Sequence, residues 1–141
     1  MEFPTYLFSF TLILSSILVS MLAIYIATSK KKLTKSVVLT MCCAAIGGFF
    51  YGLELISSTL SLKILFLELQ YIGISSISAC WVLFAMYYTS FKSRNLPLIF
   101  VALFTIPFIT FILVVTNPYH RFFYESITIL KEDNFTNLIL V

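Results

Sequence analysis

Four long apolar stretches dominate the sequence, and the charged residues stand almost entirely at their ends. No charged side chain occurs between Glu2 and Lys30, Lys35 and Glu54, Glu68 and Lys92, or Arg94 and Arg121. Each gap is close in length to the ~20 residues with which a helix crosses a ~30 Å hydrocarbon core. The pattern therefore predicts an integral membrane protein.

The same pattern predicts membrane-spanning helices at residues 4–28, 36–60, 64–89 and 96–115. Pro97 falls near the first position of the fourth helix, where a proline is tolerated, whereas Pro107 falls mid-span and should kink that helix. Only helices and closed barrels satisfy the backbone in lipid, and the chain shows no period-two barrel pattern. We expect an all-α fold, a polytopic transmembrane helix bundle.

A polar and aromatic segment, residues 116–137, follows the fourth predicted helix. Its tyrosines and phenylalanines suit the interface between membrane and water. The last four residues, 138–141, read Leu-Ile-Leu-Val and are interpreted as the possible start of a fifth span.

The charges predict an orientation. Six of the nine Lys and Arg residues lie in the segments after the first and third helices: Lys30, Lys31, Lys32, Lys35, Lys92 and Arg94. All six acidic residues fall on or near the other side. By the positive-inside rule both basic segments are cytoplasmic, so the N-terminus and residues 116–141 are expected outside the plasma membrane.

Composition excludes several classes of protein. The chain is 60% hydrophobic and 11% charged, with a mean hydropathy of +1.03, whereas soluble domains carry about 25% charge and disordered ones few apolar residues. No nucleophile–base arrangement, glycine-rich phosphate loop or metal-ligand spacing is present in the sequence, so we expect no enzyme activity, cofactor or metal. The basic residues flank apolar spans, so we expect no nucleic acid partner either.

Small residues recur four apart in the second predicted helix, at Ala44, Gly48 and Gly52. Such a stripe lets another helix approach closely. It fits either a dimer interface or packing inside one bundle, and the third helix offers a partner stripe of Gly73, Ser76 and Cys80.

Glu54 is the most informative ionisable residue. It lies about 18 residues into the predicted second helix, hence ~27 Å along it and in the outer third of the membrane. A carboxyl group there is costly and usually faces a bundle interior or a wet cavity. Glu54 either binds a ligand or proton, or pairs structurally with Lys63 or Arg121.

Other polar residues are expected near Glu54 on the outer side. They are Glu68, Gln70, Asn117, His120 and Arg121. Convergent polar groups suit a small-molecule pocket, and the alternative is a rim of solvated side chains. Trp81, in the middle of the third helix, is expected to pack in the core.

Three segments resemble the N-terminal seven-transmembrane sensor region of bacterial histidine kinases. The first is residues 51–58, Tyr-Gly-Leu-Glu-Leu-Ile-Ser-Ser, similar to a stretch with glycine and glutamate late in the second helix of that family, although here only one residue separates Gly52 from Glu54. The second is Leu69-Gln70-Tyr71-Ile72-Gly73, followed by Trp81 and Tyr88-Thr89. The third, residues 116–124, looks like the Thr-Asn-x-x-His-x-x-Phe-Trp stretch of that family, with Tyr124 in place of Trp.

The resemblance implies the input region of a two-component signalling protein, which detects an extracytoplasmic or membrane-borne stimulus. In that family the seventh helix leads to a cytoplasmic output domain. The region corresponds to the first four helices, and no kinase activity is inferred for it. The implied partners are the lipid bilayer, a second copy or a full-length relative, and a small-molecule ligand.

Two other functions compete with the sensor hypothesis. A small membrane protein that regulates another through the second helix would also carry the glycine stripe. A transporter or channel subunit would need ionisable residues through the membrane depth, and the cytoplasmic halves of the predicted helices carry none.

Overall fold

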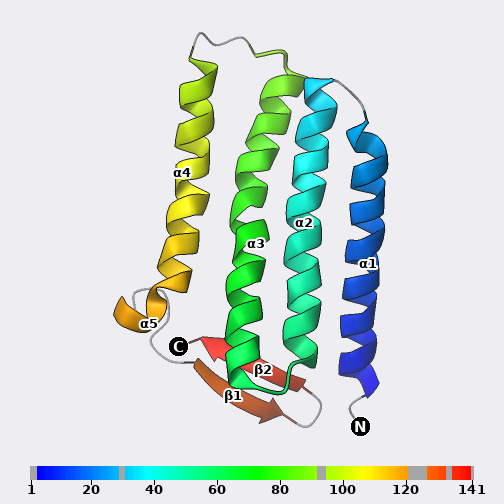
Figure 1. Cartoon of the computed structure of the whole chain (residues 1–141), viewed down its shortest axis with the longest axis vertical. Coiled ribbons are helices and arrows are strands. Elements are labelled where there is room, and N and C mark those ends of the chain that lie inside the picture. Colours follow the sequence, from blue (N-terminus) through cyan, green and yellow to red (C-terminus); the bar gives the residue numbers. More distant parts are fainter. Residues whose placement is uncertain (1–2, 29–30, 92–94, 121–126, 133–134, 141) are drawn as a thin grey trace.

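The computed structural model describes residues 3–28, 31–91, 95–120, 127–132 and 135–140. Four long helices stand side by side in chain order (Figure 1). They are α1 (Phe3–Ala27), α2 (Lys32–Ile56), α3 (Leu60–Tyr88) and α4 (Leu96–Val115). A short helix α5 (Asn117–His120) and two antiparallel strands, β1 (Ile127–Glu132) and β2 (Phe135–Leu140), follow them.

All four long helices are long and apolar enough to cross a membrane. The shortest, α4, has 20 residues, hence ~30 Å at 1.5 Å per residue. Large apolar side chains face outward, for example Ile24 at 73% and Ile106 at 71% exposure, as expected where lipid is the solvent. The predicted all-α transmembrane fold is confirmed, and the protein is a multi-pass membrane protein.

The boundaries of α2 and α3 differ from the predicted ones by several residues, and those of α1 by one. α2 begins at Lys32 and α3 at Leu60, each four residues earlier than expected, whereas α4 has the predicted bounds. The Lys35 side chain in the first turn of α2 is exposed and can extend toward water, so this helix can start before its apolar part does. α2 ends at Ile56, four residues before the predicted end, and the Ser57 hydroxyl donates to the Leu53 carbonyl there, at 2.7 Å.

Residues 138–140 belong to β2 and do not begin a fifth helix, contrary to the interpretation of the segment 138–141. The register pairs Ile127 with Leu140 and Glu132 with Phe135. The β-branched residues of 127–129 favour an extended partner strand. Val141 lies outside the described residues.

Each helix packs mainly on its neighbour in the sequence. On α1 the small residues Ser9, Ser16 and Ala23, spaced seven apart, are all buried. They face α2, where a Cβ atom added to Gly48 would lie 2.7 Å from Ser16 Oγ. The missing side chains therefore let α1 and α2 approach closely.

The contact between α2 and α3 is closer still. A Cβ atom added to Gly73 would collide with the Cys43 carbonyl oxygen and would lie 2.7 Å from the Gly47 backbone nitrogen. Two backbones meet here with no side chain between them. Cys43 and Cys80 pack beside this contact, with their Sγ atoms 3.6 Å apart.

We predict that Gly73→Ala lowers the free energy of unfolding by about 1–3 kcal/mol, because the added methyl group overpacks a backbone contact. The matched control is Gly47→Ala on the same interface, where the nearest atom, Ile74 Cγ1, is 3.4 Å from the added Cβ. Thermal unfolding of the purified protein in detergent, followed by circular dichroism, measures both. Equal stability of the two variants would show that α2 and α3 do not touch at Gly73.

Candidate functional site

A buried polar cluster joins the end of α2 to the beginning of α3. Glu54 lies in the last turn of α2, Lys63 in the first turns of α3, and Gln70 two turns further along α3. Lys63 Nζ donates to the backbone carbonyl of Glu54 at 3.0 Å. Gln70 Nε2 donates to Glu54 Oε2 at 2.9 Å. We call these three residues the α2–α3 clasp.

The clasp is almost closed to its surroundings. Glu54 is 6% exposed, Lys63 0% and Gln70 5%. A carboxylate at a helix C-terminus is unfavourable next to the helix dipole, and the nearby Lys63 ammonium offsets this because the two charges attract each other. Lys63 also pairs with one of the carbonyl groups that the end of α2 leaves without a helical partner.

The clasp uses its polar groups to hold two helices together. Glu54 is bound through both its side chain and its backbone, and α2 and α3 are joined by only three residues, 57–59. Since the helix ends at Ile56, Glu54 lies one turn from the helix end and not deeper in the span. Of the two interpretations of Glu54, this geometry matches structural pairing, with Lys63 as partner.

The other polar residues named from the sequence are placed as follows. Glu68 is half-buried on α3, and Asn117, at the start of α5, is 1% exposed. Arg121 and the side chain of His120 lie outside the described part of the chain. The structure therefore brings Gln70 to Glu54. No three His, Cys, Asp or Glu residues of the described part form a group able to hold a metal ion.

The small-residue stripes are arranged differently from the expectation. Gly48 and Gly52 pack against α1, so α1 fills the surface that was also considered for a dimer. Ala44 is exposed. On α3, Gly73 and Cys80 face α2, whereas Ser76 faces a groove between α3 and α4.

Both basic segments lie at the same end of the helices, between α1 and α2 and between α3 and α4 (Figure 1). Lys31 and Lys35 are exposed there. Lys30, Lys92 and Arg94, and the side chain of Lys32, lie outside the described residues. The α2–α3 clasp, α5 and the two strands lie at the opposite end.

Two features of α3 and α4 were missed by the sequence analysis. Trp81 is 57% exposed and packs edge-on against Phe84, so it is not a core residue. A groove of about 550 Å³ lies between the two helices and is lined by phenylalanines of α4. Their spacing of four, four and three residues, at Phe100, Phe104, Phe108 and Phe111, is the signal that marks this face of the helix.

Comparison with known proteins gives one match. A family model described as the N-terminal 7TM region of histidine kinase matches residues 11–141. The match covers α2, α3 and α4 entirely and most of α1. No curated protein and no solved structure matches the chain.

We predict that the clasp residues are energetically coupled. Lys63→Met leaves the Glu54 carboxylate buried beside an unpaired carbonyl, and we expect it to cost about 3–5 kcal/mol of stability. Glu54→Gln removes the charge and keeps an acceptor for Gln70. The double variant should be more stable than the sum of the two single effects predicts, by about 1–3 kcal/mol. Thermal unfolding of all four proteins in detergent measures this, and strictly additive effects would refute the coupling.

Proposed function

We propose that the chain, which belongs to the family of N-terminal 7TM regions of histidine kinases, is the membrane-embedded input region of a two-component signalling protein. The observation that carries this proposal is the family match over residues 11–141, which coincides with four helices able to span a membrane. The chain would contribute detection of a stimulus, and phosphoryl transfer would belong to a separate output domain.

The proposal includes an orientation, with the basic end in the cytoplasm. Both linkers at that end follow odd-numbered helices, and cytoplasmic loops carry an excess of Lys and Arg. The α2–α3 clasp, α5 and the strands would then face the outside. An extracytoplasmic stimulus would meet this end first.

The clasp would define how such a stimulus reaches the rest of the molecule. Glu54, Lys63 and Gln70 fix the outer end of α2 to α3, and the Gly73 contact fixes their middle. The two helices would therefore move as one unit. α4 packs on this pair less extensively than α1 does, so it would be the helix that shifts by the ~1–2 Å that signalling transitions use.

The buried charges favour a sensor over a transporter or channel subunit. Among the described Asp, Glu, Lys and Arg residues, the buried ones are Glu54 and Lys63, and both lie at one end of the helices. A transport path needs polar groups through the membrane depth.

The orientation is tested with cysteines and a membrane-impermeant maleimide on intact cells. Ser58→Cys, in the exposed α2–α3 turn, should react directly, whereas Lys31→Cys should react only after the cells are permeabilised. The native cysteines lie within α2 and α3, out of reach of a charged reagent. Labelling of Lys31→Cys alone in intact cells would reverse the proposed orientation.

The sensory role is tested in the source cell. Deleting the gene should change the phosphorylated fraction of a response regulator, measured on phosphate-affinity gels. Wild-type protein should restore it, and Lys63→Met, which loosens the clasp, should restore less than Lys35→Met, a change of the same type at an exposed position. An unchanged phosphorylation state of every response regulator after deletion would refute the role.

A further inference from the structure

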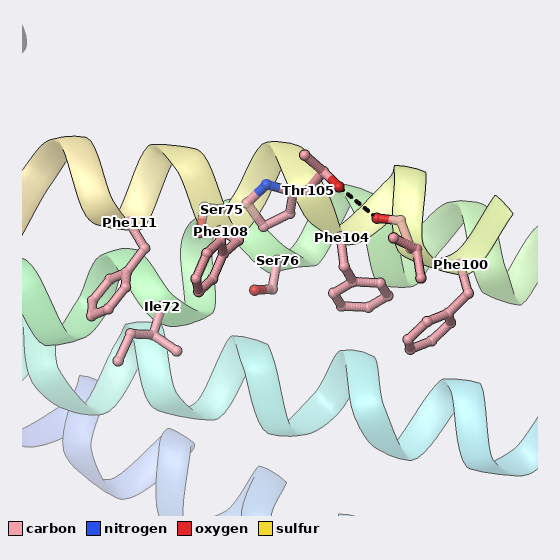
Figure 2. A pocket seen from close by; sticks show the side chains of 10 residues that line it. Ile72, Ser75, Ser76, Phe100, Phe104, Thr105, Phe108 and Phe111 are labelled. Atoms are coloured by element: carbon pink, nitrogen blue, oxygen red, sulfur yellow. Dashed lines mark hydrogen bonds between the residues drawn. The ribbon is translucent and has the colours of Figure 1, made fainter. Parts of the chain in front are cut away.

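The groove between α3 and α4 has an aromatic wall. Its volume is about 550 Å³, within the ~300–1,000 Å³ typical of small-molecule sites. Four phenylalanines of α4 form one wall, and Ser75 and Ser76 of α3 form the floor. Figure 2 shows the phenylalanine side chains reaching from α4 across α3 toward the same open space.

The phenylalanine wall offers flat surfaces for stacking. The rings of Phe100 and Phe104 are stacked, with centroids 4.6 Å apart and planes 29° from parallel. Phe108 is 64% exposed, so its ring is free to receive a partner. Aromatic rings prefer such offset-stacked neighbours, and a planar guest would therefore extend the row.

One hydroxyl group in the groove is available to a guest. Ser75 donates to the Tyr71 carbonyl at 2.5 Å, and Thr105 to the Val101 carbonyl at 2.8 Å, so both are used within their own helices. Within the part of the chain that the structure describes, Ser76 makes no such bond. Its oxygen lies in the space between Phe104 and Phe108 (Figure 2).

A further helix is a poorer occupant than a small molecule. Where helices of this protein meet closely, glycine, serine and cysteine lie at the contact, as at Gly48, Gly52 and Gly73. Such contacts need small side chains because the backbones approach each other. The phenylalanine wall of α4 would hold an incoming helix away and leave the Ser76 hydroxyl without a partner.

We propose that this groove binds a bilayer-dissolved molecule with a planar apolar ring and a carbonyl oxygen, the chemistry of a quinone. The ring would stack on the phenylalanines of α4, and the Ser76 hydroxyl would donate to the carbonyl oxygen. The guest would arrive sideways from the lipid, because Val101 and Phe108 at the groove are 62% and 64% exposed. The inference concerns binding and stands independently of the sensory role.

The test is photolabelling of the full chain in lipid nanodiscs. Two probes, an azido-benzoquinone and an azido-naphthoquinone with the same short alkyl tail, distinguish the two ring types. Labelled residues are mapped by mass spectrometry after proteolysis. We expect saturable labelling of α4 between Phe100 and Phe111 with at least one probe, competed by an excess of the same quinone without the azide.

Three substitutions sharpen the test. Ser76→Leu fills the groove and should reduce labelling at least tenfold, whereas its control Ser78→Leu, at an exposed position of α3, should leave it unchanged. Ser76→Ala should weaken competition by the quinone without the azide about 2- to 10-fold, which corresponds to the loss of one hydrogen bond. If Ser76→Leu fails to fold by circular dichroism, Phe104→Leu replaces it, with Phe10→Leu on exposed α1 as control.

Several results would overturn the proposal. One is labelling spread over the lipid-facing residues of α1 and α4 without competition, which shows partition into the bilayer alone. Another is equally strong labelling of the groove by a photoreactive fatty acid, which shows a slot for a lipid chain. A third is crosslinking of the groove to a second copy of the chain, which shows a helix as its occupant.

Discussion

The backbone contact between α2 and α3 at Gly73 is the constraint on which the rest of the arrangement depends. It brings two helices so close that only glycine fits, and it thereby fixes which residues of each can meet above and below it. Below it, three polar residues close into the clasp at the end of the pair. Above it, Cys43 and Cys80 are pressed together in the core.

Burying the charged groups of the clasp costs hydration free energy, which their mutual attraction and hydrogen bonds offset. In a low-dielectric interior a carboxylate and an ammonium each lose several kcal/mol of hydration, and only good geometry repays this. The short α2–α3 turn supplies that geometry, because it presents Lys63 to the last turn of α2 without a long loop to order.

Much of the fold is predictable from the sequence because crossing a membrane depends on length and hydropathy alone. The spacing of charges predicts four helices, and α4 has the predicted bounds. Whether an apolar residue faces lipid or protein is not predictable in this way, because both surroundings are apolar. For that reason the sequence placed Trp81 and Ala44 in protein contacts, whereas the structure has both exposed.

The candidate site shows the same limit. The burial of Glu54 follows from its place in an apolar span, and Lys63 was one of its two expected partners. That Gln70 reaches Glu54 follows from the register of α3 against α2, which hydropathy does not encode. The groove at Ser76 depends on the same register between α3 and α4.

The order of the helices in space has a consequence for biogenesis. Each helix after α1 packs on the helix that precedes it in the chain, so a neighbour is already in the membrane when it leaves the ribosome. No helix has to wait for a distant segment before it can bury its small residues. The bundle can therefore assemble one helix at a time, with little loop entropy to overcome at each step.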